Sequence, residues 1–219
     1  MELMIRIQQT ADRLFHRFGI RSVTMDDVAK EISVSKKTIY SCFRDKNELV
    51  LSIINQHVQE NNQQINNIVE SEANPIKRFA QIAAYIIQRH NQLNPALIND
   101  LKKYHPEAYE KISRFREEKV IMHVMRSIRD GRNLGLFRTD FHDIVIAHAF
   151  SALTFAIFES ESLAALNINH EISVVEIIKY HLRSIATPLG LQELEKVEWP
   201  NKTNTDNGTK SVTEINHHP

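Results

Sequence analysis

Apolar residues recur every three or four positions along most of this chain, and that spacing places them on one face of an α-helix. The 219 residues include only five glycines and six prolines, the two residue types that interrupt helices most strongly. The chain is also rich in alanine, glutamate, glutamine and lysine, which helix interiors accommodate well. We therefore predict an almost wholly helical protein.

The N-terminal part contains two short helices between two longer ones. Residues 3–18 carry the first predicted helix. Thr24 opens a second, two-turn helix with a sequence typical of a capping box, and Ser35 caps a third short helix. Asp45 begins a fourth helix of about 25 residues, which would span roughly 37 Å. A helix of that length can join two regions of the molecule.

Prolines mark the starts of further helices, because proline at the first helical position loses no hydrogen bond. We predict these helices near residues 75–91, 95–103, 106–131, 140–166 and 171–186. Residues from about 200 on lack apolar periodicity. We therefore expect residues 191–219 to form a polar, disordered tail.

The sequence argues against several functional classes. The single cysteine, Cys42, excludes a disulfide framework and a four-cysteine metal site. The sequence contains no glycine-rich phosphate loop or nucleophile elbow, and its one Glu-x-x-His spacing, Glu214 to His217, lies in the tail. We predict no catalytic residue, no metal site and no cofactor. The charged start and the limited apolar stretch at 144–158 predict neither a signal peptide nor a membrane span, so we expect a cytoplasmic protein.

The second and third helices are too short to form a core, so they are expected to pack on the first helix as a helix-turn-helix. The residues expected to face inward are Val28, Ala29, Ile32, Val34, Ile39 and Phe43. From Ser35 to Lys46, four cations stand against one anion, although the whole chain has 27 basic and 27 acidic residues. An exposed helix with this local charge suits the major groove of DNA, where phosphate contacts fix its register and polar side chains meet base edges.

The stretch "FGIRSVTMDDVAKEISVSKKTIYSCFRDKNEL" closely resembles the DNA-binding domain of TetR-family transcriptional regulators. The family pattern has Phe-x-x-x-Gly, then Thr-x-x-[Asp/Glu]-[Ile/Val]-Ala, and later [Ile/Leu]-Tyr-x-x-Phe-x-x-Lys-x-x-Leu. The matching positions here are Phe15 to Ile20, Thr24 to Ala29, and Ile39, Tyr40, Phe43, Lys46 and Leu49. The match is weaker at "GRNLGLFRTDF", and the rest of the chain agrees by its helix layout alone.

Two positions depart from the family pattern. Ser33 stands where the family usually has glycine, at a turn position that favours positive φ, so we expect a cost of about 1 kcal/mol. Cys42 stands where the family often has a histidine or an aromatic residue near the DNA backbone. A redox switch at Cys42 is the alternative to ordinary packing of this thiol.

The resemblance implies an all-α protein with a three-helix helix-turn-helix DNA-binding domain, residues 1–50. A long helix would join it to a ligand-binding and dimerisation domain, residues 51–190. The implied DNA-binding residues are Thr24, Ser35, Lys36, Lys37, Thr38, Tyr40, Ser41 and Lys46. Thr24, Lys36 and Lys46 are expected to contact phosphates, and Tyr40 the DNA backbone. The alternative is a solvated helix face that happens to carry lysines.

The resemblance also assigns dimerisation and effector sensing to the C-terminal helices. The helix that contains residues 144–158 is apolar almost all round. Val174, Ile178 and Leu182 are expected to complete a four-helix interface with a second subunit. The alternative is burial of these residues within one subunit. The predicted function is that of a transcriptional repressor. It would bind a palindromic operator in double-stranded DNA as a homodimer, and a small apolar or amphipathic effector would release it.

The effector pocket is expected among the helices between residues 75 and 158. Its candidate residues are Phe79, Ala83, Tyr85, Tyr104, Phe115, Met122, His123, His148, Phe150 and Phe155. An occupied pocket is expected to shift the helix at 95–103 and to swing the long fourth helix. Ordinary core packing is the alternative for each of these residues. A helical scaffold for a protein partner remains the alternative function of this half of the chain.

Overall fold

The computed structural model describes residues 2–91, 95–159 and 170–200. In those ranges the only pairing of extended backbone is an isolated bridge between Phe137 and Ala186. The helices are α1 (Glu2–Phe18), α2 (Met25–Glu31), α3 (Lys36–Cys42), α4 (Lys46–Ser71), α5 (Pro75–Asn91), α6 (Pro95–Tyr104), α7 (Pro106–Asn133), α8 (Asp143–Glu159), α10 (His170–Ile185) and α11 (Pro188–Glu195). The predicted all-α fold is confirmed.

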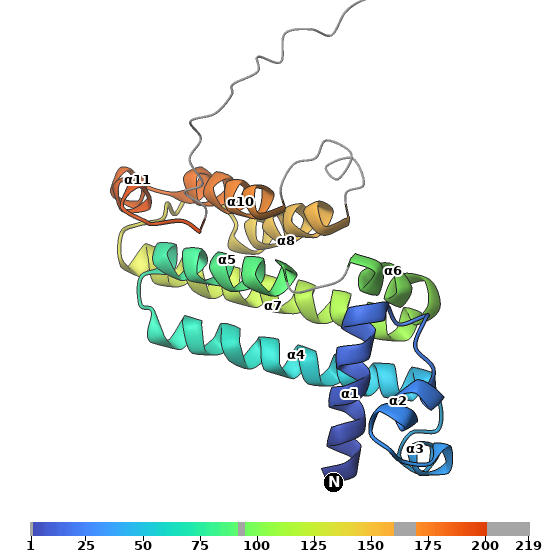
Figure 1. Cartoon of the computed structure of the whole chain (residues 1–219). Coiled ribbons are helices and arrows are strands. Elements are labelled where there is room, and N and C mark those ends of the chain that lie inside the picture. Colours follow the sequence, from blue (N-terminus) through green and yellow to red (C-terminus); the bar gives the residue numbers. More distant parts are fainter. Residues whose placement is uncertain (1, 92–94, 160–169, 201–219) are drawn as a thin grey trace, which may run out of the picture.

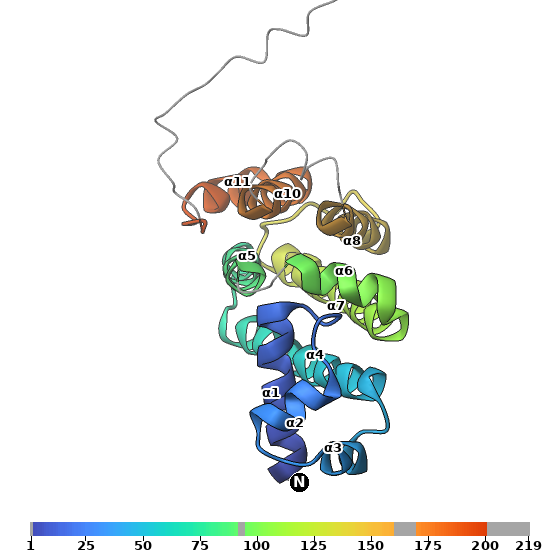
Figure 2. The same cartoon turned by 45° about the vertical axis from the view of Figure 1, so that its right-hand side comes forward.

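The long helices stack in layers (Figure 1). Helix α4 forms one layer, α5 and α7 lie against it, and α8 and α10 form the layer beyond them. Helix α1 crosses α4, and α2 and α3 lie at the end of the molecule furthest from α8 and α10. The turned view in Figure 2 shows the same separation. We call α1, α2 and α3, with the loops between them, the head.

The head is held by a buried cluster that reaches beyond its own three helices. Helices α2 and α3 have only seven residues each, too few to be stable in isolation. Their buried residues pack with those of α1 and α4, and with Leu97 and Leu101 of α6 and Ala108 of α7. The division of the chain at residue 50 therefore cuts through this core. Movement of α6 relative to the head is resisted by apolar burial on both sides of the boundary.

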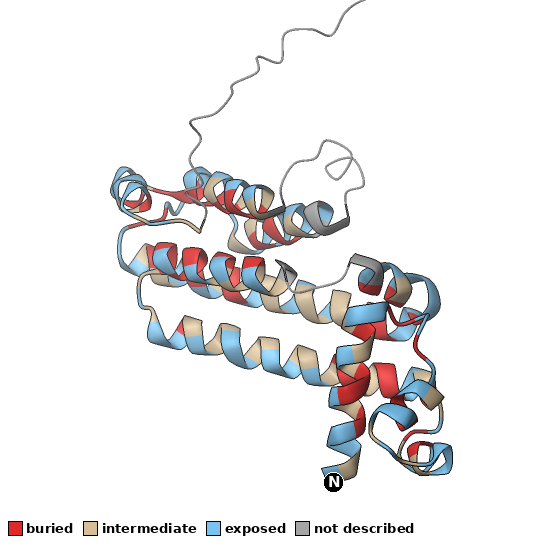
Figure 3. Ribbon diagram, viewed as in Figure 1, coloured by how far each residue is buried: buried red, intermediate tan, exposed pale blue. Residues whose placement is uncertain are grey.

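A second buried cluster joins α5, α7, α8 and α10 (Figure 3). At its edge Arg78, which is only 3% exposed, donates to the carbonyl oxygen of Glu72 from Nε at 3.1 Å and from Nη2 at 2.9 Å. Its Nη1 donates to the carboxylate of Asp130 at 2.9 Å. A buried guanidinium that lost one of these partners would be costly, so Arg78 fixes the turn between α4 and α5 against α7.

The chain beyond residue 190 differs from the prediction. Residues 188–195 form α11, in which the Thr187 hydroxyl caps the helix by accepting from the N–H of Gly190 at 3.1 Å. Leu194 is buried, and Val197 and Trp199 pack against the second cluster. The prediction that residues 191–199 belong to a polar tail is therefore wrong. Pro188 starts a helix as well as ending the previous one, since proline is well accommodated at the first helical position.

Other predicted boundaries agree with the structure or fall outside it. Helix α7 continues to Asn133, two residues further than predicted. The predicted end of its successor at residue 166 and the tail from residue 201 lie outside the described residues.

The turn between α2 and α3 confirms the expectation for Ser33, whose φ is 57°. Its N–H donates to the carbonyl oxygen of Lys30 at 3.1 Å, and the N–H of Val34 donates to that of Ala29 at 2.9 Å. These bonds satisfy carbonyl groups at the end of α2, and they require a left-handed residue at this position. The serine Cβ is strained there, because the left-handed conformation brings it close to the backbone.

Replacement of Ser33 by glycine is expected to stabilise the protein by about 0.5–1 kcal/mol, since glycine adopts positive φ without this steric cost. Urea unfolding measures the difference. Ser33→Ala is the matched control, because it removes the hydroxyl and keeps the Cβ. Equal stability of the glycine and alanine variants would contradict the account of this turn.

Candidate nucleic-acid interface

The start of α2 is closed by a reciprocal pair of hydrogen bonds. The Thr24 hydroxyl accepts from the N–H of Asp27 at 3.2 Å, and the Asp27 carboxylate accepts from the N–H of Thr24 at 2.9 Å. The same hydroxyl donates to that carboxylate at 2.6 Å. The bonds from Thr24 lower the pKa of Asp27, so the anion of this cap persists at lower pH than an ordinary aspartate. Thr24 is exposed, as a phosphate contact requires.

The hydroxyls of α3 are also engaged in holding the helix together. The Ser35 hydroxyl accepts from the N–H of Thr38 at 3.1 Å and lies 2.8 Å from the Thr38 hydroxyl. The Ser41 hydroxyl donates to the carbonyl oxygen of Thr38 at 2.7 Å. Because α3 has only seven residues, these bonds matter for its first and last turns. Lys37 and Tyr40 are both exposed on this helix.

Lys36 on α3 forms an ion pair with Asp26 on α2. Its Nζ lies 2.9 Å from Oδ1 of Asp26, and the hydrogen bond to Asp26 raises the pKa of Lys36. The same ammonium lies 5.9 Å from the centroid of the Tyr40 ring. Both members of the ion pair are well exposed, so the pair adds little to stability. A DNA phosphate at Lys36 would compete with Asp26.

Lys46 is turned inward, which the sequence analysis did not anticipate. Its Nζ donates to the carbonyl oxygen of Ile20 at 2.5 Å and lies 3.5 Å from that of Arg21. Burial lowers the pKa of Lys46 by desolvating its ammonium. The side chain therefore ties the first turn of α4 to the loop between α1 and α2. A phosphate contact by Lys46 stays a prediction, and it would have to replace or share this tie.

Arg44 is a cation that the sequence analysis counted without assigning it a role. It lies between α3 and α4, with a side chain that is 84% exposed. Its Nε is 3.3 Å from the Asp45 carboxylate, and its backbone N–H donates to Glu48 at 2.6 Å. The backbone is fixed while the guanidinium faces solvent. The local excess of cations from Ser35 to Lys46 was the signal that pointed to it.

Helix α6 meets the head through polar contacts as well as through the buried cluster. The N–H of Arg21 donates to Oδ2 of Asp100 at 2.8 Å. The Arg21 guanidinium and the Lys103 ammonium lie 5.2 and 5.5 Å from the centroid of the Tyr104 ring. Tyr104 thus belongs to the junction between α6 and the head. Its assignment to the effector pocket stays a prediction, and its ring contacts Arg21 of the α1–α2 loop.

Part of the predicted effector site does come together. The ring centroids of Phe79 on α5 and Phe150 on α8 are 5.7 Å apart, and that of His181 on α10 lies 4.2 Å from Phe150. Ala83 is buried in the same cluster. His181 was not predicted as a site residue, because a histidine within the apolar stripe of a helix is more often part of a core.

Burial keeps two histidines, His123 on α7 and His181 on α10, neutral near pH 7. His181 is 4% exposed and His123 is 9% exposed. Desolvation lowers the pKa of each to about 4, and at His123 the charges of Lys119, Arg126 and Arg78 act in the same direction. Among the described residues, neither His181 Nε2 nor the two ring nitrogens of His123 has a hydrogen-bond partner. Such atoms are suited to a polar group of a bound molecule or to a buried water.

The remaining predicted pocket residues are dispersed. The Tyr85 hydroxyl donates to α4, at Asn61. Phe115 is half-buried, with the Lys119 ammonium 5.8 Å from its ring centroid. Met122 and His148 are exposed on the surface of this chain, and the side chain of Phe155 lies outside the described residues.

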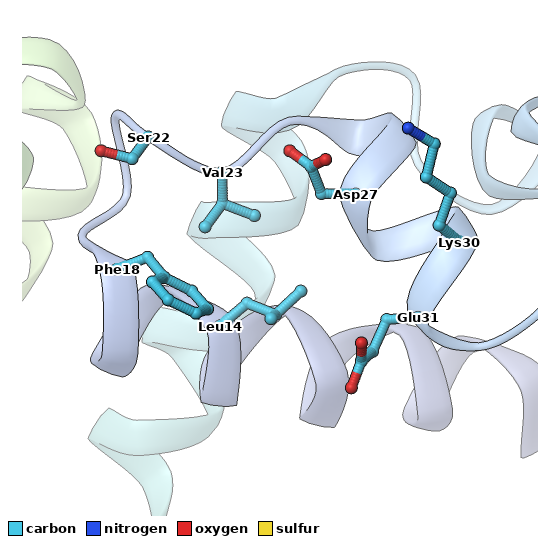
Figure 4. A pocket seen from close by; sticks show the side chains of 7 residues that line it. All are labelled: Leu14, Phe18, Ser22, Val23, Asp27, Lys30 and Glu31. Atoms are coloured by element: carbon cyan, nitrogen blue, oxygen red, sulfur yellow. The ribbon is translucent and has the colours of Figure 1, made fainter.

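An open pocket of about 570 Å³ lies instead on the head, between α1 and α2 (Figure 4). It is lined by Leu14, Phe18, Ser22, Val23, Asp27, Lys30 and Glu31. Figure 4 shows two carboxylates on one side of it and apolar side chains on the other. Sequence analysis gave no indication of this pocket.

The apolar surface of α8 and α10 differs from the prediction. Val174, Ile178 and Leu182 are buried within this chain, so their assignment to a subunit interface is wrong and the alternative of internal packing is correct. The apolar stripe of α10 faces its own core. The exposed stripe of α8, which we call the outer face of α8, consists of Ile144, Val145, His148, Ala149, Ala152, Leu153 and Ala156.

Among the described helices, none is both long and apolar enough to cross a membrane.

The arrangement of the head agrees with a match to a known protein family. Residues 7–53 match the model of the bacterial regulatory proteins of the tetR family. The N-terminal part of the chain therefore carries a tetR-family domain. This match covers most of α1, all of α2 and α3, and the first turns of α4. This family is one of regulators, in accord with the prediction that the chain is not an enzyme.

Similar proteins extend the likeness beyond the head. The uncharacterized HTH-type transcriptional regulator YvaF of Bacillus subtilis is 33% identical over 114 residues, which are 52% of this chain and 60% of that protein. The fold is similar to a transcriptional regulator from Cytophaga hutchinsonii, with a TM-score of 0.70 and 16% identity over 83% of this chain and 97% of the other. A putative transcriptional regulator from Saccharomonospora viridis, solved in complex with choline, has a TM-score of 0.57 and 21% identity over 85% and 98%.

The inward tie of Lys46 predicts an effect on stability in the absence of DNA. Lys46→Ala is expected to lower the free energy of unfolding by about 1–2 kcal/mol, because the carbonyl group of Ile20 loses its hydrogen-bond donor. Lys37→Ala removes an exposed lysine nearby and is expected to change it by less than about 0.5 kcal/mol. Urea unfolding of both variants measures the difference. Equal stability would show that the Lys46 tie does not form in solution.

Proposed function

We propose that this protein is a DNA-binding transcriptional regulator that acts as a homodimer and is released from its operator by a small molecule. The observation that carries the proposal is the geometry of α3. It is exposed at one extremity of the molecule, it is capped at Ser35, it carries Lys37 and Tyr40, and Arg44 follows it before α4 begins. The family match of the head supports the same function.

On DNA, α3 would enter the major groove, where Lys37 and Thr38 read base edges. Lys36 and Arg44 would contact phosphates, and Tyr40 the sugar-phosphate backbone. Thr24 and Ser35 stand at helix starts, whose backbone N–H groups favour a phosphate. The hydroxyls of Ser35 and Ser41 would exchange their intrahelical bonds for contacts with DNA. Lys46 would act mainly by fixing α4 to the head.

The phosphate assignment is tested by the salt dependence of binding. Arg44→Ala is expected to weaken binding to all duplexes and to reduce the slope of log affinity against log salt by about one unit, because one phosphate contact is lost. Fluorescence anisotropy with labelled duplexes at several salt concentrations measures both quantities. Lys77→Ala on the exposed surface of α5 is the control of equal charge change. An unchanged slope for Arg44→Ala would remove Arg44 from the interface.

The outer face of α8 supports dimerisation. It is a continuous stripe with His148 as its one polar residue, and Ile144 and Val145 are 50% and 60% exposed. Exposed apolar stripes of this length on a soluble protein favour a partner. Because a twofold axis places the same stripe on both subunits, two copies of α8 can pack against one another. A dimer would also present two α3 helices to the two halves of a palindrome.

A charge on the outer face of α8 is expected to break the dimer. Val145→Glu would place two unpaired carboxylates in one twofold interface, and it is expected to raise the dimer dissociation constant by a factor of ten or more. Size-exclusion chromatography with light scattering reads the mass. Gln81→Glu, at an exposed position on α5, is the matched control. A Val145→Glu protein that stays dimeric at the same concentrations would place the interface elsewhere.

The effector site is proposed near Phe79, Phe150 and His181. Aromatic rings and a neutral buried imidazole suit an apolar or amphipathic molecule with one hydrogen-bonding group. The complex of the related regulator from Saccharomonospora viridis with choline supports small-molecule binding by this fold. Release from DNA requires that the effector bind the two conformations with different affinity. The contacts of α6 with the head would transmit the conformational change from the effector site to α3.

A further inference from the structure

A carboxylate on α1 lies between two histidines from different helices. Oδ1 of Asp12 is 3.2 Å from Nδ1 of His16, one turn further along α1, and 3.0 Å from Nε2 of His57 on α4. The two imidazole rings are stacked, with centroids 5.9 Å apart. Burial raises the pKa of the Asp12 carboxyl, but the hydrogen bonds and charges of the two histidines lower it well below its ordinary value. Asp12 is therefore an anion throughout the physiological pH range.

A third helix joins this cluster through Arg89 of α5. Nη2 of Arg89 lies 3.1 Å from Nδ1 of His57. A guanidinium can only donate hydrogen bonds, so Nδ1 of His57 must be the acceptor and cannot carry a proton. The hydrogen on a neutral His57 is then on Nε2, from which it is donated to Asp12. His57 in this conformation is therefore a neutral imidazole of one defined tautomer.

We propose that the chain of contacts Arg89–His57–Asp12 is a proton-sensitive link between α5, in the predicted ligand-binding domain, and the head, and that His57 is its positioning residue. In its neutral form His57 connects α5 to α4 through Arg89, and α4 to α1 through Asp12. One side chain thus spans the two parts of the molecule that a regulator has to couple. The consequence for DNA affinity rests on the function proposed above.

A proton on Nδ1 of His57 would change the two contacts in opposite directions. The bond from Arg89 would be lost and replaced by repulsion between two cations, whereas the contact with Asp12 would become an ion pair. The charged and titratable groups around His57 are Asp12 and His16 from α1, Glu60 one turn further along α4, and Tyr85 and Arg89 from α5. Protonation therefore frees the end of α5 from α4 and leaves α4 attached to the head.

His16 strengthens this response. The hydrogen bond to Asp12 raises the pKa of His16, and its Nδ1 also lies 2.9 Å from the carbonyl oxygen of Asp12. Since both oxygen atoms only accept, Nδ1 of His16 carries a hydrogen. The stability that this contact adds is fully present below the ordinary histidine pKa, near 6.5, and is lost as the pH rises through the raised value. Acidification thus strengthens this contact within α1, which keeps Asp12 in place, while it releases α5.

The contacts of His57 lie where α1 packs on α4, and this packing sets the orientation of the head. Helix α1 crosses α4 near the end of the head that packs on α6 (Figure 1), and α4 contacts both α5 and α7. If α4 is free to shift relative to α5, the two α3 helices of a dimer lose their fixed separation. We therefore expect operator affinity to fall when His57 takes up a proton.

The first test determines the tautomer of His57 in the absence of DNA. Long-range ¹H–¹⁵N spectra of the full-length protein at pH 8 are expected to show His57 as the neutral tautomer with its proton on Nε2. In Arg89→Met this preference should weaken, because the donor that fixes it is gone. A wild-type His57 that carries its proton on Nδ1 at pH 8 would overturn the proposal.

The second test measures operator affinity of the full-length protein between pH 8 and pH 6 at constant salt. The wild type is expected to lose about fivefold or more in affinity relative to His57→Gln, which cannot titrate. His142→Gln, at an exposed position before α8, controls for the removal of a histidine and should behave like the wild type. Arg89→Gln keeps a donor without the charge, so it should lose less affinity than the wild type between pH 8 and pH 6, because no second cation then repels a protonated His57.

The possible results separate this proposal from the proposed function. If the wild type and His57→Gln have the same pH profile while both bind DNA, the link is wrong and the function stands. If neither binds any duplex at low ionic strength, the proposed function fails, and the tautomer measurement still decides whether the link exists.

Discussion

The buried cluster shared by α1, α4 and α6 determines the position of α3, and with it the surface that would face DNA. Two helices of seven residues cannot maintain their own conformation, so the orientation of α3 is inherited from the helices beneath it. Leu97 and Leu101 bring α6 into that cluster. As a result the head is not packed as an independent unit, because α4 and α6 share its core. Apolar packing favours such coupling because closely packed side chains move in discrete steps.

Polar contacts around this cluster define which movements are permitted. Lys46 and Asp100 attach the α1–α2 loop to α4 and α6, and Asp12 attaches α1 to α4. Further from the head, Arg78 attaches the α4–α5 turn to α7. Each attachment joins a different pair of elements. Helix α4 is thus held at its first turn, its middle and its end. A helix held in this way can transmit a movement from α5 and α7 to the head.

Local sequence signals predicted most of the fold. Capping residues such as Thr24 and Ser35 and helix-starting prolines such as Pro75 and Pro106 mark real helix ends, since they satisfy or remove backbone N–H groups at those positions. The positive φ of Ser33 was also predictable, from a family pattern that has glycine there. Helix α11 was missed because Pro188 both ends one helix and begins another.

The direction of individual side chains was less predictable, because it depends on tertiary contacts. The periodicity of α10 identified Val174, Ile178 and Leu182 as one apolar stripe, but it did not tell whether the stripe faces its own core or a partner. A lysine at a helix start suits a phosphate and a backbone carbonyl equally well, and the latter is what Lys46 contacts. The contacts of His57 with Arg89 and with Asp12 join residues 32 and 45 positions apart and had no local signal at all.

The central claim is that two copies of this chain present α3 to the two halves of one duplex. Selection of bound duplexes from a random pool, followed by sequencing, tests it most directly. The account predicts a palindrome whose half-site centres are about 34–36 Å apart, or a multiple of one helical turn. A pool that shows no enrichment at low ionic strength, or that yields a single half-site without symmetry, would contradict it.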